Sequence, residues 1–142
     1  MHMITPWVHK VQYYETDQMQ MVHHSNFIRW FEECRVHILD EIGYGYEKLE
    51  AAGVASPVLT IEAKISKSVH FGETVEIRAA VEKFDGIRLT IRYEVRRANA
   101  GELCCTGKTS HCFLGQDGRP LSLKRKFPEV YEAFQTLPTE FV

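Results

Sequence analysis

The sequence lacks a long apolar run, a leader-like start and an excess of one charge. No segment approaches the roughly 20 consecutive apolar residues that span a bilayer, and residues 1–6 show no charged stretch followed by an apolar one. We therefore expect a cytoplasmic protein that makes no contact with a membrane. The formal net charge of −2 argues against a general nucleic-acid binder, which needs a basic surface.

Cysteine is scarce, and the few metal-ligating side chains have no ligand spacing. The four cysteines form no Cys-x-x-Cys pair, and they are Cys34, Cys104, Cys105 and Cys112. This pattern favours small apolar packing groups over a zinc site or a disulfide framework. His23 and His24 are adjacent, so their side chains point in different directions, and no third ligand is spaced to join them. We expect no metal and no cofactor.

Residues 1–142 have the length and composition of a single folded domain. The chain is 44% hydrophobic and 25% charged, which is ordinary for a globular protein of this size. It contains no evident linker, internal repeat or low-complexity segment. One core over residues 1–142 is therefore expected.

The first half of the chain predicts a strand followed by a long helix. Aromatic and β-branched residues from about Trp7 to Glu15 indicate the strand. Between Phe27 and Ile42 the apolar residues recur at helical spacing over about half of the circumference, so this helix should lie buried against a broad surface. The expected caps are Ser25 or Asn26 at its start and Gly43 and Gly45 at its end. A shorter helical segment follows, from Tyr46 to Ala52.

The second half alternates apolar and polar residues and predicts four strands. They span about 59–71, 75–81, 87–95 and 103–114, and turn signals lie at 85–86, 99–101 and 117–118. A short amphipathic helix over 127–134 ends the pattern. Together these elements predict an α+β protein in which a five-stranded antiparallel sheet packs one apolar face on the long helix. Because such a sheet leaves its edges unpaired, a neighbouring subunit is expected to extend it.

The densest group of polar and aromatic residues, residues 13–27, lies between the first strand and the long helix. The first N–H groups of a helix lack internal partners and carry positive partial charge, so they can bind a carbonyl oxygen that becomes anionic during acyl transfer. Asp17 supplies a carboxylate a few residues upstream. A carboxylate and a helix N-terminus form a minimal acyl-transfer site.

These residues resemble a known family. Thr16-Asp17 followed by Val22, His24, Asn26 and the Phe27 helix is similar to the 4-hydroxybenzoyl-CoA thioesterase-like branch of the hot-dog acyl-CoA thioesterases. Segments 29–35, 69–73, 107–113 and 118–120 also resemble that family, so the likeness covers nearly the whole chain. It implies a hot-dog fold, in which the sheet wraps around one long central helix and a short C-terminal helix follows. It further implies a homodimer or homotetramer with active sites at the subunit interface.

The resemblance also implies the chemistry. Asp17 is expected to act on an acyl-CoA thioester either as the nucleophile, through a mixed anhydride, or as the general base that activates water. The backbone N–H of His24 is expected to polarise the thioester carbonyl, and its imidazole to orient water or assist departure of the thiolate. The candidate substrate-binding residues of the loop are Gln20, Val22, His23, Asn26 and Phe27. Those for the coenzyme A phosphates are Arg88, Arg119, Lys124, Arg125 and Lys126.

Several of these residues can also have a purely structural role. Asp17 can be a turn-capping residue, and Lys124 to Lys126 a solvated basic face. His70 and His111 are expected to be satisfied histidines of the sheet rather than parts of an acyl channel. Arg35 falls within the apolar arc of the long helix, so a buried partner such as a nearby carboxylate is expected.

Gln20 is the clearest departure from the family pattern. Relatives commonly have glycine three residues after the aspartate, and a left-handed glutamine there would cost about 1 kcal/mol. Either the loop is rebuilt or Gln20 lines the site. This departure motivates a second hypothesis, a non-catalytic module that binds or senses acyl-CoA. Hydration or dehydration of an acyl thioester is a third and is disfavoured, because the loop carries no Asp-His hydratase pattern.

Overall fold

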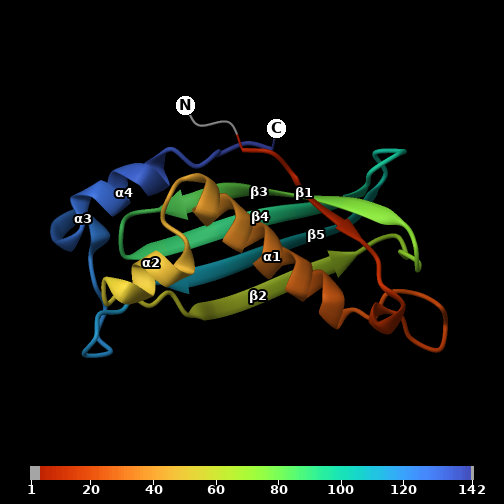
Figure 1. The fold of residues 1–142 in the computed structure, drawn as a ribbon, viewed down its shortest axis with the longest axis horizontal. Coiled ribbons are helices and arrows are strands. Elements are labelled where there is room, and N and C mark those ends of the chain that lie inside the picture. The colour runs from red at the N-terminus through yellow and green to blue at the C-terminus, as the bar shows by residue number, and fades with distance from the viewer. Residues whose placement is uncertain (1–3, 142) are drawn as a thin grey trace.

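The computed structural model describes residues 4–141, which form a five-stranded antiparallel sheet with one long helix across one face (Figure 1). The strands lie in the order β1-β3-β4-β5-β2. The elements are β1 (Trp7–Lys10), a 3-10 turn (Tyr13–Glu15), α1 (Ser25–Glu41), α2 (Tyr46–Ala51), β2 (Val58–Ile65), β3 (Thr74–Phe84), β4 (Arg88–Arg97), β5 (Leu103–Cys112), α3 (Leu123–Lys126) and α4 (Pro128–Gln135). The expected α+β architecture is confirmed, and the C-terminal helix is divided into α3 and α4. None of the helices within residues 4–141 has the length and apolar character needed to cross a membrane.

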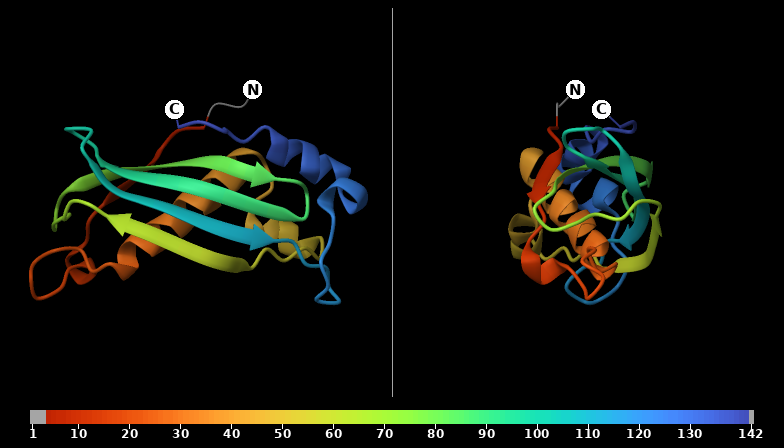
Figure 2. Two further views of the ribbon diagram at one scale, coloured as in Figure 1. Left: turned by 180° about the vertical axis from the view of Figure 1, so that it is seen from behind. Right: turned by 90° about the vertical axis from the view of Figure 1, so that its right-hand side faces the viewer.

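Helix α1 is buried along its apolar face, and the sheet curves around it (Figure 2). Trp30 and Phe31 are fully buried, which stabilises the fold by roughly 1.5–3 kcal/mol for each side chain. The Phe31 ring stacks on Tyr93 of β4 with 4.6 Å between ring centroids. Gly107 of β5 lies under the same ring, because a Cβ atom there would stand 2.2 Å from it. Only glycine lets β5 approach α1 this closely.

The start of α1 differs from the expected capping. Ser25 is the first helical residue, and His24 occupies the N-cap position without a side-chain hydrogen bond. The Ser25 hydroxyl instead lies 2.9 Å from Nδ1 of His23. The Asn26 side chain donates to the backbone oxygen of Glu15 at 2.9 Å. The two expected caps therefore bind other groups.

The end of α1 follows the prediction. Gly43 has a φ of 86°, the left-handed conformation that glycine adopts without strain. The N–H of Tyr44 donates back to the oxygen of Leu39 at 3.0 Å. This hydrogen bond closes the helix and turns the chain toward α2.

Two strands are shorter than their alternation predicts. β1 ends at Lys10, and the N–H of Gln12 donates to the Glu15 carboxylate at 2.8 Å, which closes the 3-10 turn in place of a longer strand. β2 ends at Ile65 because the next two N–H groups both donate to one oxygen, that of Cys104, at 2.8 and 3.1 Å. One acceptor shared by two donors cannot continue a sheet ladder.

The apolar side chains of β2 are exposed, contrary to the expectation that they belong to the core. Ile61 pairs with Thr109, and Ile65 with Cys105, so both isoleucines point to the face that carries α1. They are nevertheless 47% and 44% exposed. β2 is an edge strand, and nothing within residues 4–141 covers it on its outer side. The alternating apolar and polar residues of β2 therefore give the edge of the sheet an exposed apolar surface in the single chain.

Arg35 is buried and has hydrogen-bond partners inside the protein, as expected, but these partners are tyrosine hydroxyls rather than a carboxylate. Its Nε donates to the hydroxyl of Tyr46 at 2.8 Å and its Nη1 to the hydroxyl of Tyr93 at 3.1 Å. The nearest carboxylate, Glu32, lies 3.9 Å away and is 71% exposed. Two phenolic oxygens therefore accept hydrogen bonds from the guanidinium inside the protein.

A chain of hydroxyls leads from Arg35 to a buried histidine. Tyr93 and Thr109 share a hydrogen bond of 2.7 Å, and Thr109 lies 2.8 Å from Nε2 of His111. His111 is fully buried in the sheet, and its Nδ1 has no partner among residues 4–141. Burial, followed by the positive charge of Arg35, lowers the pKa of His111 from 6.5 to about 4.

This lowered pKa predicts a stability that falls on mild acidification. The unfolded chain binds a proton at His111 below pH 6.5, whereas the folded chain resists it down to about pH 4. Stability is therefore complete above pH 6.5 and should fall by about 2 kcal/mol between pH 7 and pH 5. Urea unfolding of the wild type and of His111→Gln checks this, because the variant should lose most of that slope. His37→Gln, which removes a partly exposed histidine, should keep it, and equal slopes in all three proteins would contradict the assignment.

Candidate active site

Asp17 opens a tight turn that precedes α1. Its N–H donates to the oxygen of Met21 at 2.8 Å, and its own oxygen accepts the N–H of Gln20 at 2.9 Å. Its carboxylate Oδ1 accepts the N–H of Met19 at 2.8 Å. The turn-capping role considered above is therefore present and occupies one carboxylate oxygen. The side chain is only partly buried.

Gln20 is the one residue other than glycine with a positive φ within residues 4–141, and its value is 64°. This left-handed conformation costs a residue with a Cβ atom about 1 kcal/mol or slightly more. The loop therefore keeps the conformation that glycine would adopt without strain. Gln20 also lines the cleft beside Asp17, which was the other outcome considered.

The carboxylate lies in an open cleft of about 920 Å³. Its lining comes from the turn and from the segment after β2: Tyr13, Tyr14, Thr16, Asp17, Gln18, Gln20, His70 and Phe71. Tyr13 and Phe71 meet edge to face with 5.7 Å between ring centroids, and they are 77% and 59% exposed. Sequence reasoning missed these aromatic walls, because Phe71 was expected within a strand. The clustering of aromatic residues at 13–14 was the available signal.

Glu15 fixes this turn against α1 and was also missed. Its buried carboxylate accepts from Trp30 Nε1, from the N–H of Gln12 and, within hydrogen-bond distance, from His9 Nε2, each at 2.8 Å. Burial raises the pKa of Glu15, but these hydrogen bonds outweigh it and the net shift is downward. The side chain therefore stays ionised. Its backbone oxygen accepts the N–H of His23 at 2.9 Å, which brings the start of the helix to the turn.

The N-terminus of α1 lies directly after this anchor. Within residues 4–141 no group accepts the backbone N–H of His24. The rings of His23 and His24 are tilted against each other by 31° with 4.1 Å between centroids, and both residues are exposed. An unpaired N–H at a helix N-terminus is a donor for a carbonyl oxygen.

The other sequence-predicted residues fall into two groups. Val22 and Phe27 are buried in the core, and Asn26 is buried and bound to Glu15, so these three position the loop. The basic residues lie at the opposite end of the molecule, where α3 and the turn after β5 are found (Figure 1). Within one chain the structure does not bring Arg88, Arg119, Lys124, Arg125 and Lys126 to Asp17.

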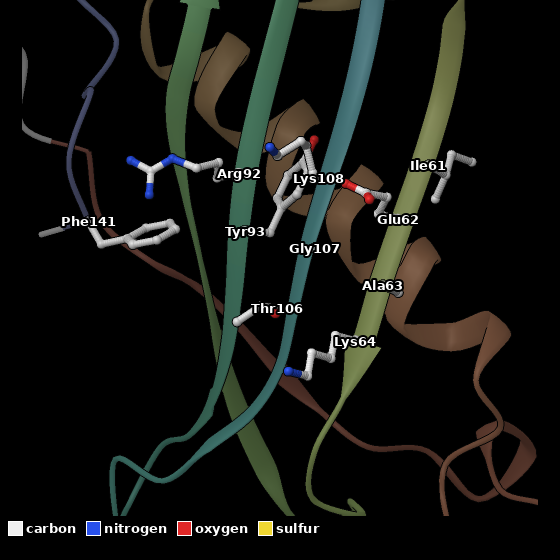
Figure 3. Close-up of a pocket in the computed structure, with 10 residues that line it drawn as sticks. All are labelled: Ile61, Glu62, Ala63, Lys64, Arg92, Tyr93, Thr106, Gly107, Lys108 and Phe141. Carbon is white, nitrogen blue, oxygen red and sulfur yellow. The ribbon is translucent and has the colours of Figure 1, made fainter.

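A second hollow of about 630 Å³ lies on the outer face of the sheet, away from α1 (Figure 3). Two of its lining cations are already engaged: Lys108 pairs with Glu82 at 2.9 Å, and the Arg92 guanidinium lies 4.9 Å from the ring centroid of Phe141. It holds no unpaired helix N-terminus. The Asp17 cleft is therefore the candidate active site. No group of three metal-ligating side chains occurs within residues 4–141.

Comparison with known proteins identifies the family. The family model described as "Thioesterase-like superfamily" matches residues 11–136. The "Putative acyl-CoA thioesterase YneP" of Bacillus subtilis (strain 168) is 32% identical over 127 residues, which cover 89% of this chain and 91% of that protein. The solved structure of a DHNA-CoA thioesterase from Staphylococcus aureus has a TM-score of 0.86 and 32% identity, covering 94% of this chain and 90% of that one.

A further solved structure agrees with this assignment. The hypothetical protein TT1821 from Thermus thermophilus has a TM-score of 0.85 and 33% identity, covering 93% of this chain and 98% of that one. The resemblance noted in the sequence is thus confirmed over nearly the whole chain. The chain belongs to the thioesterase-like superfamily, as a thioesterase with the hot-dog fold.

Proposed function

We propose that this protein hydrolyses an acyl-CoA thioester to the free acid and coenzyme A in the Asp17 cleft. The observation that carries the proposal is a partly exposed carboxylate in a 920 Å³ cleft, seven residues before an unpaired N–H at the start of a buried helix. A carboxylate can serve as base or nucleophile in thioester hydrolysis, and a positive helix terminus can stabilise the oxyanion that forms. The names of the relatives from Bacillus subtilis and Staphylococcus aureus support the same substrate class.

The contacts of Asp17 leave one carboxylate oxygen for chemistry. Oδ1 is held by the Met19 N–H, which leaves Oδ2 available to act on the substrate. As a base, Asp17 takes a proton from water while the water oxygen attacks the thioester carbon. As a nucleophile, it forms a mixed anhydride that water then cleaves. In both routes the His24 N–H and the helix dipole stabilise the oxyanion.

We further propose that two chains pair through β2. The exposed apolar side chains of this edge strand, including Ile61 and Ile65, would then be covered, and the unpaired edge would be removed. A homotetramer of two such dimers would use the outer face of the sheet, which no helix within residues 4–141 covers (Figure 3).

This pairing also accounts for the distant basic residues. β2 begins close to the turn that holds Arg119, where Leu114 bridges both Ala55 and Pro120. β2 ends close to His70, which bridges Met21 in the Asp17 turn. Two antiparallel β2 strands related by a two-fold axis would place the start of one beside the end of the other. The Asp17 cleft of one subunit would then lie beside the basic end of its partner, where Lys124 and its neighbours can bind phosphates.

Phosphate recognition predicts a preference for the whole coenzyme. kcat/KM for an acyl-CoA should exceed that for the same acyl group on N-acetylcysteamine, which carries no phosphate. Salt should narrow the gap, because exposed charges are screened over about 10 Å at 0.1 M ionic strength. Neutralising Arg119, Lys124, Arg125 and Lys126 together should raise KM and change kcat much less. Equal rates on both thioesters, independent of salt, would refute this recognition.

A binding or sensing module is the second candidate, and Gln20 is the observation that favours it. A strained glutamine in the cleft departs from the glycine of the family pattern. Such a module would bind acyl-CoA without releasing a thiol, so one assay separates the two candidates.

We also propose a cytoplasmic location. The support is that all four cysteines are free thiols, and free thiols persist in a reducing compartment. Three of the four are buried.

A further inference from the structure

We propose that His70, oriented by Glu73, is a second catalytic residue, which donates a proton to the sulfur of the leaving thiol while Asp17 acts on the carbonyl. This role rests on the proposed thioester hydrolysis. It concerns a residue that the sequence analysis expected to be a satisfied histidine of the sheet. The structure instead places His70 in the turn after β2, with its side chain 49% exposed.

His70 and Asp17 flank the same cleft. The Asp17 N–H donates to the oxygen of Met21, and Met21 in turn forms a β-bridge with His70. The three segments therefore lie side by side in the order Asp17, Met21, His70. Neighbouring extended segments lie about 4.8 Å apart, so the backbones at Asp17 and His70 are separated by about 10 Å. With both side chains lining the cleft, a thioester group fits between the carboxylate and the imidazole.

The imidazole of His70 is held in place. Its Nδ1 lies 3.1 Å from Oε1 of Glu73, and its backbone N–H donates to the same oxygen at 2.7 Å. Arg97 forms an ion pair with the other oxygen of Glu73, and Arg97 itself binds Glu102 at 2.7 Å. Burial raises the pKa of Glu73, but the bonds from Arg97 and His70 outweigh it and lower the pKa. Glu73 is thus a fixed carboxylate on Nδ1.

A carboxylate on one ring nitrogen leaves the other as the reactive one. No group within residues 4–141 binds Nε2 of His70. A histidine whose Nδ1 is oriented by a carboxylate and whose Nε2 faces a cleft is arranged for proton transfer. His23 lacks this arrangement, because its Nδ1 contacts a serine hydroxyl.

On the general-base route, Asp17 and His70 each carry one proton during the reaction. Asp17 takes one proton from water, and the water oxygen forms a bond to the thioester carbon. The carbon–sulfur bond then breaks, and its electron pair goes to sulfur. The His70 imidazolium gives its Nε2 proton to that sulfur, so the products are the acid and the free thiol. The proton held by Asp17 then passes to His70, which restores both groups.

The test compares leaving groups, because only a poor leaving group needs a general acid. His70→Gln should lower kcat on an acyl-CoA by about 100-fold, the lower end for general-acid catalysis. On the thiophenyl ester of the same acid it should lower kcat by less than about fivefold, because the more acidic aryl thiol departs as the thiolate. A purely structural loss would lower both rates equally. His37→Gln, which removes a histidine far from the cleft, should change neither rate.

The outcomes separate this proposal from the proposed function. Suppose the wild type hydrolyses acyl-CoA. If His70→Gln then turns over acyl-CoA at the wild-type rate, or loses the same factor in kcat on both esters, only the role of His70 is overturned. Absence of thiol release by the wild type on every ester would overturn both. Glu73→Gln should show the same dependence on the leaving group to a smaller extent, because the imidazole remains but loses its fixed orientation.

Discussion

Asp17→Asn is expected to lower kcat on an acyl-CoA at least about a hundredfold, the lower end for general-base catalysis, while the protein stays folded. The substitution is unusually specific at this position. The amide oxygen of asparagine can accept the Met19 N–H as Oδ1 of Asp17 does, so the turn is retained. What is lost is the charge and basicity of the second oxygen. Because Asp17 is only partly buried, the free energy of unfolding should change by less than about 0.5 kcal/mol.

The turn after β5 offers a matched control residue, Asp117. Asp117 accepts the N–H of Arg119 at 3.0 Å through Oδ1, the same local geometry that Asp17 has with Met19. Asp117→Asn should therefore retain turnover. If Asp17→Asn also turned over acyl-CoA at nearly the wild-type rate, the carboxylate would have no part in the mechanism.

The wild-type protein is expected to be at least a dimer. Charged side chains on the face of β2 that is turned toward α1 should dissociate the dimer into single chains. Ile61 and Ile65 are nearly half exposed in the single chain, and covering each would stabilise an assembly by up to roughly 1.5–3 kcal/mol. The double substitution Ile61→Lys and Ile65→Lys would bury two unpaired charges in the interface. Light scattering should then show a particle of 16.4 kDa, the mass of one chain. Turnover of acyl-CoA should fall with it.

The control for this prediction lies on the same strand. Glu62 faces the outer side of the sheet, where its register partner is Lys108. Glu62→Lys should leave the dimer paired through β2 intact, because that side chain points away from the proposed apolar contact. A wild-type protein that scatters light as a monomer at micromolar concentration would defeat the pairing through β2 and the shared site that depends on it.

The sequence predicted the features that depend on local pattern. The spacing of apolar residues located α1, and its stop glycine is confirmed by the φ of 86° at Gly43. The polar stretch before α1 located the Asp17 turn. Gln20 was singled out because relatives carry glycine at that position, and it lines the cleft, which was one of the two alternatives left open. Each of these features is set by neighbouring residues, so periodicity and turn chemistry are sufficient to find it.

The features that were missed depend on contacts between distant segments. Phe71 meets Tyr13 only because the chain after β2 folds back on the turn, and His70 reaches the cleft for the same reason. Glu15 looked like one more polar residue, although it accepts hydrogen bonds from β1, the turn and α1. The apolar side of β2 was assigned to the core, because alternation cannot tell a buried strand from an edge that another subunit covers.

The central claim is hydrolysis of an acyl-CoA, and thiol release measures it most directly. The wild-type chain should be incubated with a panel of alkyl and aryl acyl-CoAs and the free thiol followed with a disulfide reagent. A protein-only blank is needed because Cys112 is partly exposed. The wild type is expected to release coenzyme A from at least one member of the panel, and the Asp17→Asn variant to release almost none. Acyl-CoA that binds tightly and releases no thiol would contradict this claim and would leave the sensing module in its place.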